Sequence, residues 1–179
     1  KPKILIMVLI TTILGFYLGG NVISSFGLLL TTLLGTGLSA GGAGALNHYL
    51  EREADTRMVR TKNRPLPSGL IIPSEALIFG IILVLIGCTL LSWKVNLLTG
   101  FLSLLTAFLY VLVYTPLKKI TWLNTTIGSI PGAIPPMGGW TAATGSLDVE
   151  AWLLFAILFI WQHPHFFAIA WVCRDDYER

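Results

Sequence analysis

The sequence predicts an all-α fold, a polytopic bundle of transmembrane helices that forms a single domain over residues 1–179. Only 12% of the residues are charged and 54% are hydrophobic, whereas a water-soluble domain carries about 25% charged residues. The apolar residues are gathered in stretches close to the ~20 residues that a helix needs to cross the hydrocarbon layer. These stretches do not alternate between apolar and polar residues, as the strands of a membrane barrel do, so helices are the better interpretation.

Six stretches are long enough to cross a membrane, and they lie at residues 4–20, 26–46, 74–93, 96–115, 122–142 and 150–172. The first has no small-residue cleavage site, so we expect it to remain as a helix rather than to be removed as a signal peptide. The third opens at Pro73 and Ser74, and Ser74 is expected to cap its amino terminus. The fourth is a plain apolar run.

Small residues mark the second stretch. Gly37, Gly41 and Ala45 recur there at four-residue spacing, which allows a neighbouring helix backbone to approach closely in lipid. The same thin side chains would also leave room for a bulky ligand, and the spacing is compatible with both interpretations.

The fifth and sixth stretches carry residues that are unusual inside a membrane. The fifth has prolines at positions 131, 135 and 136, which predicts a kinked helix beside an internal cavity rather than a rod that faces lipid. The sixth contains Gln162, His163 and His165. Polar side chains are costly in an apolar span and favour a functional site, although a neutral histidine hydrogen-bonded to another helix explains them equally well.

Lysine and arginine fall almost entirely on one side of the predicted bundle. The opposite side has only Lys94. The basic side has eleven such residues: Lys1, Lys3, Arg52, Arg57, Arg60, Lys62, Arg64, Lys118, Lys119, Arg174 and Arg179. Because basic loops stay on the cytoplasmic side, the amino terminus and these loops are predicted to be cytoplasmic.

An amide and two carboxylates follow the small residues of the second stretch. Asn47, Glu51 and Asp55 recur at four-residue spacing, so on a helix that continues past the membrane surface they form one stripe, each ~40° and ~6 Å from the last. Such oxygen ligands suit Mg²⁺, which is held by one or two carboxylates together with substrate phosphates. A solvated helix end with incidental charges fits the spacing as well.

Cations near this stripe favour a site for a polyanion. They are Arg57, Arg60, Lys62 and Arg64 directly after the stripe, with Lys118 and Lys119 in the next basic loop. Acids that hold a metal, with arginine and lysine beside them, make a diphosphate site, because the metal and the cations together neutralise the phosphate oxygens. Asp175 and Asp176 form a second acidic pair on the same side, which would allow a second metal ion.

Together these residues resemble the intramembrane prenyltransferases of the UbiA superfamily. Asn47, Glu51 and Asp55, followed by "MVRTKNRPLPSG", match its first aspartate-rich motif, although the family usually has Asp where this chain has Glu51. Within the superfamily, "YTPLKKITWLNTTIGSIPGAIPPMGGW", "WQHPHF" and "DDYER" are similar to the protoheme IX farnesyltransferases, and the resemblance covers essentially the whole chain. It implies about nine helices, so we expect the six present here to be part of a longer protein.

The resemblance implies an activity and the residues that perform it. The activity is the Mg²⁺-dependent transfer of a farnesyl group from farnesyl diphosphate to a vinyl group of haem b, with addition of water. The implied metal ligands are Asn47, Glu51, Asp55, Asp175 and Asp176, which with Lys118 form the catalytic set. The implied substrate-binding set is Arg60, Lys62, Arg64, Tyr114, Lys119, Asn124, Trp140 and His165. Tyr114 and Trp140 would shelter an allylic cation. His165 would ligate or orient haem, whereas His163 falls at a variable position.

Two other classes of function are less compatible with the sequence. A relative that prenylates an aromatic acid or a quinone precursor would share "RTKNRPLPSG" but lack "GAIPPMGGW" and "WQHPHF". A six-helix transporter or channel would carry charged groups deep in its spans, and these spans lack them. We expect an integral protein of the bacterial cytoplasmic membrane, with the mitochondrial inner membrane as the alternative. Its expected partners are membrane lipid and the downstream haem A synthase. We expect no binding to nucleic acid.

Overall fold

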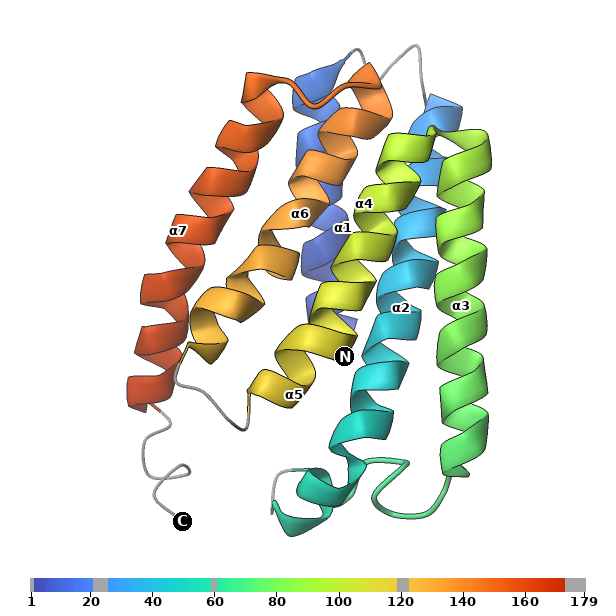
Figure 1. The fold of residues 1–179 in the computed structure, drawn as a ribbon, viewed down its shortest axis with the longest axis vertical. Coiled ribbons are helices and arrows are strands. Elements are labelled where there is room, and N and C mark those ends of the chain that lie inside the picture. The colour runs from blue at the N-terminus through green and yellow to red at the C-terminus, as the bar shows by residue number, and fades with distance from the viewer. Residues whose placement is uncertain (1, 21–25, 59–60, 119–122, 173–179) are drawn as a thin grey trace.

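The computed structural model describes residues 2–20, 26–58, 61–118 and 123–172, which form a bundle of helices packed side by side (Figure 1). The elements are α1 (Pro2–Gly19), α2 (Phe26–Arg57), α3 (Pro73–Lys94), α4 (Leu97–Phe108), the π-helix η2 (Leu109–Tyr114), α5 (Thr115–Leu117), α6 (Asn124–Thr144) and α7 (Val149–Val172). Helices α4, η2 and α5 follow one another without a break and act as one long helix. The all-α prediction is therefore confirmed, and the described chain crosses the bundle six times.

Successive crossings run in opposite directions, so the bundle has two distinct ends (Figure 1). At one end α2 stops, α3 begins, α5 stops and α6 begins. We call this the basic end, because Arg57, Lys62, Arg64 and Lys118 lie there. Lys94 closes α3 at the opposite end, where its ammonium group lies 4.5 Å from the centre of the Trp93 ring.

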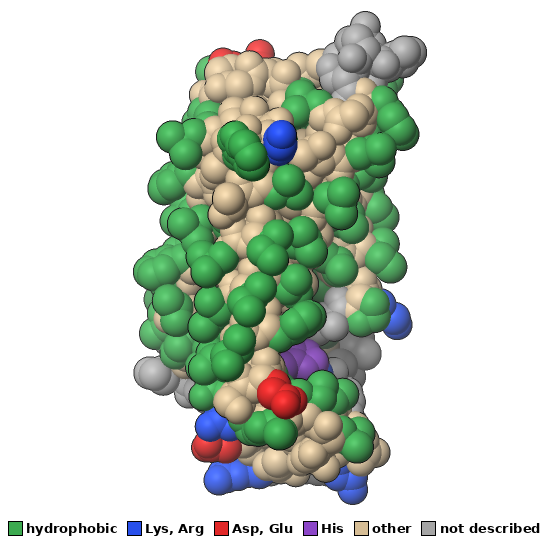
Figure 2. Space-filling model, turned by 90° about the vertical axis from the view of Figure 1, so that its right-hand side faces the viewer, with side chains coloured by type: hydrophobic (Ala, Val, Ile, Leu, Met, Phe, Trp, Pro, Cys, Tyr) green, Lys and Arg blue, Asp and Glu red, His purple; other side chains and the backbone are tan. Residues whose placement is uncertain are grey.

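Five of the described crossings are long and apolar enough to span a membrane, namely α1, α2, α3, the α4–α5 helix and α7. Hydrophobic side chains cover the middle of the face drawn in Figure 2, and most of the charged side chains on that face lie near its lower end. This distribution is that of an integral membrane protein.

Helix α6, which has three prolines inside it, is absent from that group. It lies inside the bundle instead, packed against α1, α4 and α7, and residues 133–137 are all buried. This placement confirms that the proline-rich segment is a helix that does not face lipid along its length, whereas its kink and the cavity beside it stay predictions.

Helix α2 packs closely on α3 through glycines that differ from the predicted ones. A Cβ atom added at Gly42 would lie 2.6 Å from the backbone oxygen of Gly80. The predicted row is less tightly packed: a Cβ at Gly41 would meet nothing within 4 Å, and one at Gly37 would meet only a Leu9 methyl group at 3.8 Å. The close-packing interpretation was therefore right for the helix but wrong for the residues.

The start of α3 also differs from the prediction. Ile72 is the residue that precedes the first turn, Pro73 begins the helix, and no side chain caps it. Proline suits this position because it has no N–H to leave unbonded and its φ is already helical. The prediction that Ser74 caps the helix was wrong.

Candidate functional site

The predicted stripe of one amide and two carboxylates is buried. Helix α2 continues to Arg57, well past the apolar stretch, and carries the stripe on its last three turns. Asn47 is 1% exposed, Glu51 7% and Asp55 5%. The stripe therefore faces protein rather than lipid or water, and the alternative of a solvated helix end is wrong.

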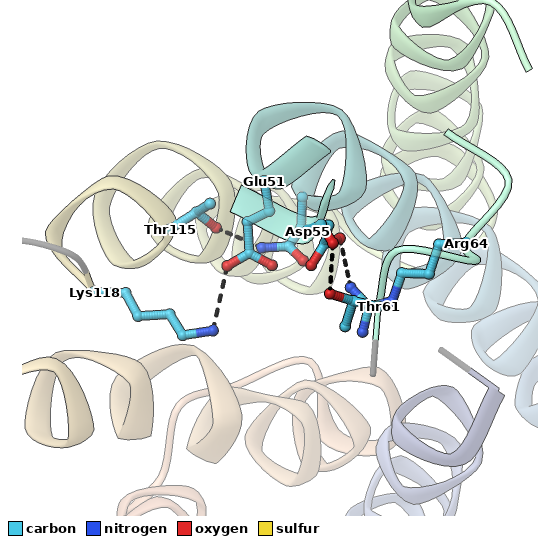
Figure 3. Close-up of polar contacts among 7 residues, drawn as sticks. Glu51, Asp55, Thr61, Arg64, Thr115 and Lys118 are labelled. Carbon is cyan, nitrogen blue, oxygen red and sulfur yellow. Dashed lines mark hydrogen bonds and ion pairs between the residues drawn. The ribbon is translucent and has the colours of Figure 1, made fainter. Parts of the chain in front are cut away.

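The first two members of the stripe contact the helix that ends in α5 (Figure 3). The Asn47 side-chain nitrogen donates a hydrogen bond to the Thr115 hydroxyl at 2.9 Å. One turn further along, the Lys118 ammonium group lies 3.3 Å from a carboxylate oxygen of Glu51. The sequence predicted that Lys118 belongs to the site. The structure brings it to the Glu51 carboxylate of α2 from the end of a different helix, α5.

The third member of the stripe is covered by the loop that follows α2. Arg64 donates to the Asp55 carboxylate at 2.7 Å, and the Thr61 hydroxyl donates to the Asp55 backbone oxygen at 2.9 Å (Figure 3). Thr61 is 2% exposed, whereas Lys62 beside it is exposed. The loop therefore folds back over the end of α2 and delivers one of the predicted cations to the carboxylate.

Apolar packing one turn away sets the position of these groups. A buried cluster joins α2, α3 and the α4–η2 helix, and its members are Ala43, Val84, Cys88, Ala107 and Val111. Ala43 and Val111 each lie four residues before Asn47 and Thr115 respectively. The contact that packs the two helices therefore continues directly into the hydrogen bond between these two polar side chains.

Two further predicted residues, Tyr114 and Asn124, belong to helices that meet at the basic end. Tyr114 precedes Thr115, and its ring stacks on that of Tyr110 with centroids 5.8 Å apart. A Cβ atom at Gly128 would lie 2.6 Å from the Tyr114 ring, so this ring packs directly against α6. Asn124 is the first residue of α6 and is half-buried.

Trp140 lies near the other end of α6 and is not brought to the stripe. Its indole N–H donates to the Asp148 carboxylate at 3.2 Å in the connection between α6 and α7. The pKa of Asp148 is held below its usual value by two hydrogen bonds to its carboxylate, with the larger effect from Ser146 and the smaller from Trp140. Tyr114 and Trp140 therefore do not form one aromatic wall beside the carboxylates, and substrate binding by Trp140 remains a prediction.

The polar residues of α7 fall into two groups. Gln162 donates to a backbone carbonyl of α6 at 3.2 Å, and a ring nitrogen of His163 lies 3.2 Å from the Thr126 hydroxyl. These contacts support the structural explanation for both. His165 is exposed and stacks on Trp161, with ring centres 4.7 Å apart. Its predicted role toward haem remains a prediction.

Four predicted site residues, Arg60, Lys119, Asp175 and Asp176, lie outside the described residues. Within the described ranges no group of three or more His, Cys, Asp and Glu residues could enclose a metal ion. The stripe supplies two carboxylates and one amide. This donor set fits Mg²⁺ that completes its shell with phosphate oxygens and water, and it does not fit a metal held by protein alone.

Sequence reasoning missed Thr115 and Thr61, which both bond to the stripe. A signal for Thr115 was present, since a polar threonine directly before Pro116, near the end of a membrane helix, is not explained by apolar packing. No comparable signal marks Thr61, because threonine is common in loops.

Taken together, these features define a helical membrane protein whose buried carboxylates are met by cations at one end of the bundle. The UbiA prenyltransferase family matches residues 8–179. The chain belongs to this family.

Curated relatives match the whole chain. Protoheme IX farnesyltransferase of Salinibacter ruber is 50% identical to it and that of Solibacter usitatus 46%. The human mitochondrial protein of the same name is 47% identical. All three alignments cover 100% of this chain, but the chain spans only 63%, 64% and 40% of those proteins respectively. No solved structure matches the chain.

Proposed function

We propose that this protein transfers the farnesyl group of farnesyl diphosphate to a vinyl group of haem b, giving hydroxyethylfarnesyl haem (haem O) and diphosphate. The observation that carries the proposal is the identity of 46%, 50% and 47% over the whole chain to three relatives named protoheme IX farnesyltransferase. The buried stripe supports the diphosphate half of this reaction.

The residues of the stripe would bind the diphosphate end of the donor. Asn47, Glu51 and Asp55 would hold Mg²⁺, which when bound neutralises charge on the leaving group. Arg64 and Lys118 lie 2.7 and 3.3 Å from the two carboxylates. When the diphosphate enters, both cations can exchange a carboxylate oxygen for a phosphate oxygen, and they then stabilise the charge that develops on the leaving group.

The reaction balances in three steps. The bond between the first farnesyl carbon and the diphosphate oxygen breaks, and its electron pair leaves with the diphosphate. The π bond of the vinyl group breaks, and its electron pair joins the terminal vinyl carbon to the allylic carbon. Water adds its oxygen to the neighbouring vinyl carbon and releases one proton. Tyr114, the residue before Thr115, would stabilise the allylic cation through its aromatic ring.

The farnesyl chain would lie beside α2, next to Gly44. Gly44 precedes Asn47 by three residues and therefore lies on the same helical face. It is half-buried, and a Cβ atom added there would meet nothing within 4 Å, so it borders open space. Gly44→Leu is expected to lower the initial rate at least about tenfold, because the new side chain would fill that space.

The matched control for this test is Gly27→Leu. Gly27 is exposed near the start of α2, and a Cβ there also meets nothing within 4 Å. Initial rates and the amount of protein in the membrane would be compared. A wild-type rate for Gly44→Leu would place the isoprenoid elsewhere.

The basic end would face the cytoplasm of a bacterium, or the matrix if the protein is mitochondrial, because basic loops are retained on that side. Diphosphate release on this side follows from the position of the stripe. We expect the haem product to leave through the membrane phase, where the haem A synthase is the candidate partner.

The test of the function uses membranes that contain the full-length protein. They are incubated with haem b and farnesyl diphosphate, with and without Mg²⁺, and the extracted haems are separated by reversed-phase chromatography. A more hydrophobic haem that needs both farnesyl diphosphate and Mg²⁺ is expected. Unchanged haem b, with an added aromatic acid prenylated instead, would replace this function with that of another branch of the family.

A further inference from the structure

The π-helix η2 ends at Tyr114, and the next residue is Thr115, which accepts the hydrogen bond from Asn47. The backbone N–H of Thr115 bonds to the carbonyl of Tyr110, five residues earlier. The Thr115 hydroxyl donates to the same carbonyl at 2.8 Å. In an α-helical turn a threonine hydroxyl reaches back three or four residues, as Thr106 does to the carbonyl of Leu102 at 2.7 Å. The wider turn thus changes both the bonding of Thr115 and the direction in which it faces.

Pro116 gives a local reason for the wider turn. A proline ring in an α-helix collides with the carbonyl four residues earlier and has no N–H to offer it. Wide turns and prolines are both sites where helices depart from regular geometry. The sequence Thr-Pro therefore fixes a threonine, 2% exposed, against Asn47, the first member of the Asn47–Glu51–Asp55 stripe.

Counting protons determines which way the Asn47 amide is turned. A hydroxyl has one proton, and a carbonyl can only accept, so the proton of Thr115 is committed to Tyr110. Toward Asn47 the hydroxyl oxygen can therefore only accept, which requires the NH₂ group of the amide at 2.9 Å. The Asn47 amide oxygen consequently lies on the side away from Thr115.

We propose that Thr115 is a positioning residue that turns the oxygen, rather than the nitrogen, of Asn47 toward the divalent cation of the bound diphosphate. The inference rests on the proposed function, because it assigns Asn47 an oxygen ligand to that cation. With the amide reversed, the stripe would present an NH₂ group to a cation, which repels it. Thr115 therefore contributes to metal affinity although it lies on another helix and does not touch the metal.

The test measures Mn²⁺ binding to the purified full-length protein in the presence of inorganic pyrophosphate, from the electron paramagnetic resonance signal of free Mn²⁺. Thr115→Val keeps the shape but removes the hydroxyl, and it is expected to raise the Kd for Mn²⁺ about tenfold. Thr115→Ser keeps the hydroxyl and is expected to stay within about twofold of wild type. Thr106→Val, in the same long helix, is the matched control and should bind as wild type does.

A second pair of variants separates positioning from folding. An aspartate at position 47 has an oxygen on either side and needs no orientation, so Thr115→Val should weaken Mn²⁺ binding much less in the Asn47→Asp protein than in the wild type. Equal losses in both backgrounds, or wild-type binding by Thr115→Val, would overturn the inference. If the wild type itself does not bind Mn²⁺ with pyrophosphate, the metal step of the proposed function fails as well. Normal Mn²⁺ binding by a protein that forms no haem product would instead rule out haem b as the acceptor substrate and leave the role of Thr115 intact.

Discussion

Replacing Asp55 with asparagine is expected to lower the rate of farnesyl transfer by at least about a hundredfold while the protein remains in the membrane. The substitution keeps the size of the side chain but removes a charge that is 5% exposed and faces Arg64 at 2.7 Å. The stripe would then hold a divalent cation with one carboxylate instead of two. Initial rates at saturating Mg²⁺ and farnesyl diphosphate, normalised to the amount of membrane protein, measure the effect.

Glu53→Gln is the matched control for this substitution. Glu53 is on the same helix two residues earlier, and its side chain is 83% exposed and bonded only to Arg52 among the contacts described. Exposed ion pairs contribute little, so this variant should keep its rate within about twofold. A rate near that of wild type for Asp55→Asn would remove the carboxylate from the mechanism.

Replacing Gly139 with alanine is expected to leave only a small fraction of the protein folded. A Cβ atom at Gly139 would lie 2.0 Å from the backbone oxygen of Thr12 and 2.8 Å from the backbone nitrogen of Phe16, both in α1. A backbone cannot rotate away as a side chain can, so α1 would have to move off α6. Opening this interface would cost several kcal/mol, a large share of the typical ~5–15 kcal/mol stability of a protein.

The neighbouring glycine provides the control. A Cβ atom at Gly138 would meet nothing within 4 Å, and alanine is favoured over glycine inside a helix by about 0.5–1 kcal/mol. Gly138→Ala should therefore be as stable as wild type or more so. Size-exclusion chromatography in detergent and the melting temperature would be measured for both variants. Equal behaviour of the two would mean that α1 and α6 are not in backbone contact at Gly139.

The helices and the stripe followed from the sequence because each rests on a strong local signal. Long apolar runs have few alternatives to a membrane helix. Four-residue spacing keeps Asn47, Glu51 and Asp55 on one face wherever the helix continues. The spacing does not show whether that face is buried. Its burial depends on Thr115, which lies 68 residues after Asn47, and on Arg64, which lies 9 residues after Asp55.

Other features needed the three-dimensional packing. Gly37 and Gly42 are both small, and only the position of α3 decides which of them meets a neighbouring backbone. The contact of Thr115 depends on the π-helical turn. This turn has more residues than an α-helical one, so the α-helical period no longer predicts which way Thr115 faces. Trp140 is different, since it follows Asn124 by sixteen residues, or about 24 Å of helix. Its distance from the basic end was readable from the sequence.

The most direct test is the location of Mn²⁺ in a structure of the full-length protein bound to a thiodiphosphate analogue of farnesyl diphosphate, from the anomalous scattering of the metal. We expect a peak about 2.1 Å from carboxylate oxygens of Glu51 or Asp55, with Arg64 or Lys118 moved to the diphosphate. A peak remote from the Asn47–Glu51–Asp55 stripe, with both ion pairs of the stripe unchanged, would contradict it.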